Sequence, residues 1–228
     1  MHKKIQHIFF DLDHTLWDFD KNSGLTFGKI FKIHDVDVAL EDFLNVYEPI
    51  NFKYWKLYRE EQVTKQELRY GRLKEAFNEI NMSVSDQLID NLSEDYITYL
   101  STFNHVFDGA HDVLDYLNGK YELHIITNGF EEAQEKKMKA SNLKEYFNTV
   151  TNSEMVGVKK PNPKIFNFAM DLANAKPEQS VMIGDSLEAD IRGAIGVGME
   201  ALYFDYKNSD YNENYHRITQ LSTLKDLF

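Results

Sequence analysis

A short apolar run near the N-terminus ends in two closely spaced acids. Ile8, Phe9 and Phe10 are followed by Asp11 and Asp13. A run of this kind is typical of a strand buried on both faces, and acids at its end lie where a parallel sheet opens onto its ligand. Two carboxylates so close repel each other and need a cation or a shared proton. The segment therefore predicts an α/β fold with chemistry at this strand end.

The acidic excess of the chain limits its partners. Among 228 residues there are 37 Asp and Glu but only 25 Lys and Arg, for a net charge of −12. This balance disfavours binding of a nucleic acid polymer through a broad basic face. A small phosphorylated metabolite stays compatible, because a metal ion can reverse the local charge. With so many acids, a lone Asp-x-Asp pair is most often two solvated turn residues, so the motif needs support from elsewhere.

The absence of cysteine and of long apolar stretches bounds the cellular setting. Without cysteine, disulfides and thiol catalysis are excluded, which fits a reducing compartment. No apolar stretch approaches the length of a membrane span. The first strand begins so close to Met1 that no room is left for a signal peptide. We therefore expect a cytoplasmic protein that does not associate with a membrane, and the sequence leaves its oligomeric state open.

The distribution of apolar residues predicts two domains. Residues 1–15 and 103–228 carry short apolar strands alternating with helices, the pattern of a Rossmann-like parallel sheet. Residues 16–102 lack strand character and show helical spacing, which predicts a four-helix bundle inserted after the first strand. Thr64 begins a capping box at the start of the third helix, and Ser85 can cap the fourth.

Polar side chains follow two further apolar segments and precede a proline pair. The candidate site residues are Asp11, Asp13, Thr127, Asn128, Lys160, Asp185, Ser186 and Asp190. In an open parallel sheet the carboxyl ends of the strands border one crevice, so we expect these groups to converge there. Carboxylate oxygens from Asp11 and Asp185 suit Mg²⁺, and Lys160 with Thr127 suits a phosphate. Each segment alone is weak evidence, whereas four in this order are hard to attribute to chance.

These segments resemble the motifs of the haloacid-dehalogenase-like hydrolases of subfamily I, which carry a helical cap. The matching residues are Asp11-Leu12-Asp13-His14-Thr15, Thr127, Lys160, Asp185 and Asp190. The resemblance spans essentially the whole chain and implies a core of residues 1–15 and 103–228 with a cap of residues 16–102. A closer likeness, to the house-cleaning pyrimidine 5′-nucleotidases, rests on residues 9–19 and on Asn22-Ser23. It implies a nucleoside 5′-monophosphate as substrate.

The resemblance also implies a mechanism with an aspartyl-phosphate intermediate. Asp11 would attack phosphorus, and Asp13 would protonate the leaving alcohol and then activate water. Mg²⁺ would be bound by Asp11, by the backbone carbonyl of Asp13 and by Asp185. Thr127 and Lys160 would bind the phosphoryl group and offset its charge.

Four further residues receive supporting roles in this scheme. Asp190 would orient Lys160 or a metal-bound water, with Ser186 beside it. Asn128 and Trp17 are candidate substrate contacts, Trp17 as a platform for a nucleobase. An equally good interpretation of Trp17 is a hydrophobic anchor where the chain enters the inserted helices.

Other functions remain open at this level. A sugar-phosphate phosphatase or a phosphomutase would use the same core residues. The acid Asp13, two residues after Asp11, disfavours a dehalogenase, which needs neither this acid nor a metal. A receiver domain is a phospho-acceptor of a different class, a non-enzymatic module that also holds Mg²⁺ among acids at strand ends. Receiver domains are shorter and lack an insertion of about 80 residues, which is an unusual length unless it is functional.

Overall fold

The computed structural model describes residues 5–209 and 214–228. Residues 1–4, before the first strand, and residues 210–213, within the polar stretch 207–216, lie outside the described residues. The chain forms two compact units, residues 1–19 with 104–228 and residues 20–103. No helix within the described ranges combines the length and the apolar character that crossing a membrane requires.

The first unit is built on a parallel sheet of six strands. They are β1 (His7–Phe10), β2 (Glu122–Thr127), β3 (Thr149–Asn152), β4 (Ser180–Gly184), β5 (Glu200–Phe204) and β6 (Arg217–Ile218). Their order is β3-β2-β1-β4-β5-β6, and every neighbouring pair is parallel. All four residues of β1 are buried, as expected of a central strand covered on both faces. The prediction of a Rossmann-like parallel sheet is confirmed, although β6 was not predicted.

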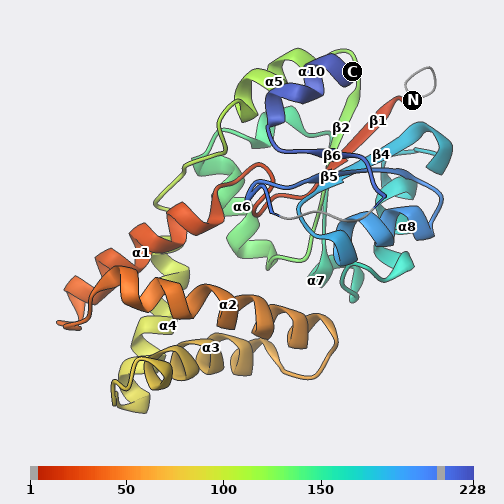
Figure 1. Cartoon of the computed structure of the whole chain (residues 1–228). Coiled ribbons are helices and arrows are strands. Elements are labelled where there is room, and N and C mark those ends of the chain that lie inside the picture. The colour runs from red at the N-terminus through yellow and green to blue at the C-terminus, as the bar shows by residue number, and fades with distance from the viewer. Residues whose placement is uncertain (1–4, 210–213) are drawn as a thin grey trace. The chain divides into compact units, whose positions relative to one another are not determined.

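Helices cover both faces of this sheet. The α-helices are α5 (Ala110–Leu117), α6 (Glu131–Ala140), α7 (Ser153–Val156), α8 (Pro163–Leu172), α9 (Gly193–Gly196) and α10 (Leu224–Leu227). Three-residue turns of 3-10 helix are η1 (Lys144–Tyr146), η2 (Pro177–Gln179) and η4 (Leu221–Thr223), and η3 (Leu187–Arg192) is a π-helix. In Figure 1, α5 and α10 lie side by side on one face of the sheet and α8 lies on the other. Pro163 occupies the first turn of α8, as predicted, because its missing N–H has no helical partner there.

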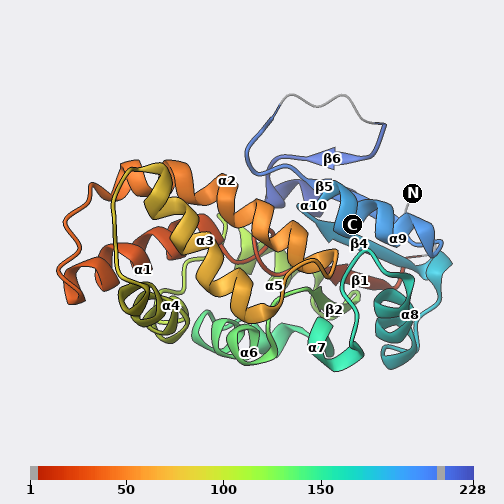
Figure 2. The same cartoon turned by 90° about the horizontal axis from the view of Figure 1, so that it is seen from below.

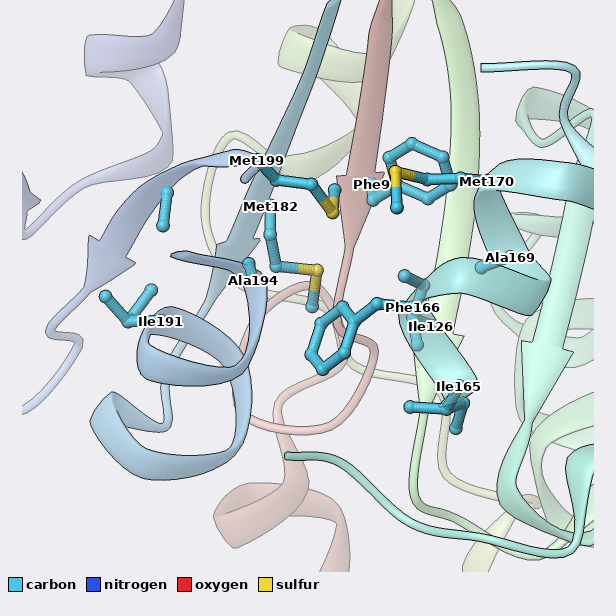
Figure 3. Close-up of a cluster of buried hydrophobic side chains, with 11 residues drawn as sticks. Phe9, Ile126, Ile165, Phe166, Ala169, Met170, Met182, Ile191, Ala194 and Met199 are labelled. Carbon is cyan, nitrogen blue, oxygen red and sulfur yellow. The ribbon is translucent and has the colours of Figure 1, made fainter. Parts of the chain in front are cut away.

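A cluster of buried side chains joins the sheet to α8 and α9. Phe9 of β1 and Met182 of β4 point toward Phe166 and Met170 of α8 (Figure 3). Figure 2 shows α8 and α9 adjacent to each other along this face. Because side chains alternate along a strand, placing Phe9 on this face places Ile8 on the other. Tight packing on both faces therefore holds β1 and carries its last residue to the carboxyl edge of the sheet.

The second unit consists of helices. They are α1 (Phe19–Ile33), which begins at the last residue of the first unit, α2 (Leu40–Arg59), α3 (Lys65–Glu79) and α4 (Asp86–Leu100). The Thr64 hydroxyl accepts a bond from the Glu67 N–H at 3.2 Å, and the Glu67 carboxylate accepts one from the Thr64 N–H at 2.7 Å. The Ser85 hydroxyl accepts a bond from the Leu88 N–H at 3.2 Å. Both predicted caps are confirmed, because capping depends only on residues three apart in sequence.

Two histidines face each other across β1 and β2. Nδ1 of His7 lies 3.2 Å from Nε2 of His124, whose other ring nitrogen lies 2.9 Å from the Thr149 hydroxyl. The His124 ring is 1% exposed and stacks on Phe9 with centroids 4.6 Å apart. Burial, and secondarily the neighbouring His7, lowers the pKa of His124 to about 4. His124 is therefore neutral in the folded protein at pH 7.

This histidine makes folding sensitive to acid. Its pKa is about 4 when folded and about 6.5 when unfolded, so between these values the unfolded chain binds a proton that the folded chain does not. The free energy of unfolding should fall as pH drops from 6.5 toward 4, by up to roughly 3 kcal/mol. Urea unfolding at pH 7 and pH 5 should show a smaller decrease for His124→Gln than for the wild type. The control, His216→Gln, changes an exposed histidine. Equal decreases in all three proteins would contradict this assignment.

Candidate active site

A buried lysine lies at the centre of the carboxyl edge of the sheet. Three oxygen atoms surround Nζ of Lys160: Asp11 Oδ1 at 2.5 Å, Asp190 Oδ1 at 2.7 Å and the backbone oxygen of Ile126 at 2.6 Å. The Lys160 side chain is 2% exposed. Burial opposes the charged ammonium, but Asp11 and Asp190 outweigh it and raise the pKa of Lys160. The ammonium donates hydrogen bonds to Asp11 and to the Ile126 carbonyl and forms an ion pair with Asp190, so Lys160 is a fixed positive charge beside Asp11.

Three carboxylates meet at this point. Oxygen atoms of Asp11, Asp185 and Asp190 all lie within 4.8 Å of one another. Burial raises the pKa of Asp11 to about 7, with Lys160 opposing and Asp190 adding to the rise. Burial and the charge of Asp11 raise the pKa of Asp185 well above its usual range. A cation would relieve this repulsion, and an all-oxygen set of ligands suits a hard divalent cation. The residues present therefore fit such a metal.

The turn after β4 determines where the carboxylate of Asp190 lies. The Ser186 N–H donates to Asp190 Oδ2 at 3.0 Å, and the Ser186 hydroxyl accepts a bond from the Ala189 N–H at 3.1 Å. Residues Leu187–Arg192 form one wide turn of π-helix, a form that is often found at functional sites. Gly184 leaves room for the carboxylate, since a Cβ there would lie 2.3 Å from Asp190 Oδ2. Ser186 and Asp190 thus support each other behind Lys160.

The residues after β2 are brought to the same edge. Thr127 is 1% exposed, and its hydroxyl oxygen accepts bonds from the Gly129 N–H at 3.1 Å and from Gln134 Nε2 at 2.7 Å. The side chain of Asn128 holds the backbone of Lys160 at both ends, accepting from its N–H at 2.7 Å and donating to its carbonyl oxygen at 3.0 Å. Asn128 was expected to contact substrate. In the structure its amide holds the Lys160 loop, and a contact with substrate stays a prediction.

Asp13 does not join the acidic cluster with its side chain. Lys137 Nζ lies 2.6 Å from its Oδ1, and Gln134 Nε2 donates to its Oδ2 at 2.8 Å. Both partners belong to α6, a helix in which no site residue was predicted from the sequence. In the sequence these two residues are marked only by their spacing, seven and ten residues after Thr127. That spacing does not show which residues of an amphipathic helix face the end of a strand.

Trp17 lies inside the first unit and offers no face to a ligand. Its side chain is 0% exposed, Lys137 Nζ lies 4.5 Å from its ring centroid, and Phe19 packs edge-on against it at 6.1 Å. A nucleobase cannot stack on a ring that is covered in this way. The geometry corresponds to the alternative interpretation, a hydrophobic anchor before the inserted helices.

Comparison with known proteins gives the family of this chain. Residues 5–198 match the haloacid dehalogenase-like hydrolases. The chain belongs to this family. Its curated relatives include pyrimidine 5′-nucleotidase YjjG of Escherichia coli, 32% identical over 96% of this chain and 95% of that one. They also include pyrimidine 5′-nucleotidase PynA of Streptococcus pneumoniae, 32% identical over 87% and 83%.

Two further comparisons extend the family assignment. Glyceraldehyde 3-phosphate phosphatase of Pyrococcus furiosus is 31% identical over 90% of this chain and 82% of that one. Among solved structures of this hydrolase family, the putative hydrolase YfnB of Bacillus subtilis, described as bound to magnesium, superposes with a TM-score of 0.88. It is 26% identical and covers 99% of both chains. The fold and the hydrolase class are thus shared along essentially the whole chain.

The packing at Gly184 gives a test of this geometry. Gly184→Ala would push a methyl group against the Asp190 carboxylate, so it should lower the free energy of unfolding by about 1–3 kcal/mol. The matched control is Gly196→Ala, where an added Cβ meets nothing within 4 Å and stability should be unchanged or rise by up to about 1 kcal/mol. Urea unfolding measures both. A neutral Gly184→Ala would contradict the placement of Asp190.

Proposed function

We propose that this protein is a divalent-metal-dependent phosphomonoester hydrolase that acts through an aspartyl-phosphate on Asp11. The supporting observation is the pairing of Asp11 with the buried ammonium of Lys160 inside a cluster of three carboxylates. This arrangement holds a carboxylate ready to attack and surrounds it with groups that can share the charge of a phosphoryl group. The second acid, Asp13, serves the leaving alcohol.

The reaction then proceeds in two balanced steps. A carboxylate oxygen of Asp11 attacks phosphorus, the bond from phosphorus to the leaving oxygen breaks, and Asp13 gives its proton to that oxygen. Asp13 next takes a proton from water, whose oxygen attacks the phosphorus of the aspartyl-phosphate. The bond to Asp11 breaks, which releases inorganic phosphate and restores the Asp11 carboxylate and the protonated Asp13.

Each remaining group has a role that matches its contacts. Asp11, Asp185 and the backbone carbonyl of Asp13 would hold Mg²⁺, which when bound neutralises phosphoryl charge and lets an anion attack. Thr127 accepts two hydrogen bonds through its oxygen and so keeps its own hydrogen for a phosphoryl oxygen. Lys160 acts through its charge, because its ammonium already bonds to Asp11 and the Ile126 carbonyl and pairs with Asp190.

Metal removal tests the first part of the proposal. Exhaustive chelation should reduce hydrolysis of 4-nitrophenyl phosphate to the level of Asp11→Asn, and added Mg²⁺ should restore it, because three clustered carboxylates repel an anionic substrate. Phosphate release is the measurement. The variant Asp11→Asn serves as the inactive control, since an amide does not attack phosphorus. Full activity after chelation would contradict the metal site.

We further propose that residues 20–103 act as a cap that selects the leaving group. The chain segments that lead into and out of this unit are hydrogen-bonded to each other, a few residues after Asp13. The Asp18 N–H donates to the His105 carbonyl at 3.1 Å, and the Phe107 N–H donates to the Leu16 carbonyl at 2.9 Å. The core side chains address only the phosphoryl group, which every phosphomonoester shares. Substrate choice therefore depends on the inserted helices, and the two nucleotidases at 32% identity support a nucleoside 5′-monophosphate, with pyrimidines preferred.

A substrate panel separates this proposal from its alternatives. We expect kcat/KM for a pyrimidine nucleoside monophosphate to exceed that for a purine monophosphate, glyceraldehyde 3-phosphate and a hexose phosphate by about tenfold or more. Phosphate release and phosphate transfer to a second sugar are measured in parallel, the latter revealing a phosphomutase. Preference for the triose phosphate, the substrate that the Pyrococcus relative is named for, would refute the nucleotidase proposal and leave the phosphatase proposal standing.

A further inference from the structure

The carboxylate of Asp13 is held by helix α6 through both of its oxygens. Lys137 Nζ contacts Oδ1 at 2.6 Å, and Gln134 Nε2 donates to Oδ2 at 2.8 Å. Two contacts on opposite oxygens determine the rotation of the carboxyl plane. Asp11, only two residues earlier, is held by Lys160 instead. The two acids at this strand end therefore have separate supports.

Lys137 is itself fixed in place. Its side chain is 4% exposed, and its ammonium lies 4.5 Å from the ring centroid of Trp17 and 5.3 Å from that of Phe19. A buried ammonium is costly unless an anion and favourable aromatic faces surround it. Lys136, the next residue of α6, is 52% exposed and pairs with Glu132 in the ordinary manner of a helix surface. The burial of Lys137 is thus particular to its place beside Asp13.

Gln134 connects the two catalytic strand ends. It is 2% exposed, and its Nε2 donates both to Asp13 Oδ2 and to the Thr127 hydroxyl, the latter at 2.7 Å. The side chain fits because residue 129 is glycine: a Cβ there would lie 2.3 Å from Gln134 Nε2. Gln134 and Lys137 are three residues apart and so share one face of α6.

We propose that Lys137 and Gln134 are positioning residues that hold Asp13 for proton transfer at the leaving-group oxygen. This inference rests on the proposed phosphatase function. Each carboxylate oxygen has two lone-pair directions, so the contact from Gln134 leaves one on Oδ2 for the proton. When the leaving oxygen separates from phosphorus, the O–H bond on Asp13 breaks and an O–H bond forms on that oxygen. Lys137 and Gln134 keep their own protons throughout.

The test compares substrates whose leaving groups differ in their need for a proton. The variants are Lys137→Met, which removes the ammonium but keeps the apolar stem, Lys137→Arg, and the control Lys136→Met, which removes a charge from the same helix. The measured quantity is kcat/KM with Mg²⁺ for 4-nitrophenyl phosphate and for an alkyl phosphate. This ratio reports the steps up to the first release of alcohol, in which Asp13 acts as the acid.

For Lys137→Met we expect a loss of about 10- to 100-fold with the alkyl phosphate and of less than about threefold with 4-nitrophenyl phosphate, whose leaving group needs little protonation. Lys137→Arg should recover most of the loss, and Lys136→Met should match the wild type. Equal losses on both substrates, or no loss on either, would overturn the proposal. Gln134→Met should show the same dependence on the leaving group. If circular dichroism shows that Lys137→Met is unfolded, Gln134→Met provides the test.

A double-mutant cycle shows whether Lys137 acts through Asp13. In an Asp13→Asn background, Lys137→Met should change the remaining hydrolysis of the alkyl phosphate by less than about twofold, because the group it positions is already gone. A further loss as large as in the wild type would overturn the inference. An inert wild-type protein would refute the phosphatase function together with this inference, whereas an active wild type with equal losses refutes the inference alone.

Discussion

The buried ammonium of Lys160 is the interaction on which the site depends. An unpaired charge at 2% exposure would be strongly destabilising, so the fold must deliver acceptors to it. They come from three places: the end of β1, the backbone of β2 and the turn after β4. Asn128 in turn holds the backbone of Lys160. A single pairing requirement thus ties distant segments to one edge of the sheet and holds there the carboxylate that we propose as the nucleophile.

Two acids only two residues apart have different surroundings, and this difference suits different tasks. Asp11 is enclosed with other carboxylates, and burial raises its pKa, which suits the cation binding that we propose for it. The side chain of Asp13 is 21% exposed and is held from α6, away from the cluster. This separation from the cluster suits the proton transfer that we propose for Asp13.

Much of the fold could be predicted from short stretches of the sequence. The apolar runs before Asp11, Thr127 and Asp185 became β1, β2 and β4, and the capping residues began the helices that they predicted. These features depend on neighbours a few residues apart. The sequence did not predict β6, α7 and α10, which are two, four and four residues long and too short for any periodicity to identify them.

The sequence by itself determined which chemical groups stand at the strand ends and their order, because a parallel sheet brings its carboxyl ends to one edge whatever the details of packing. Only the tertiary structure decided what those groups touch. It turned Asn128 onto the Lys160 backbone, enclosed Trp17, and paired Asp13 with Lys137, 124 residues further along the chain. Such pairings follow from how a helix face packs against a strand end, and helical spacing alone does not say which face that is.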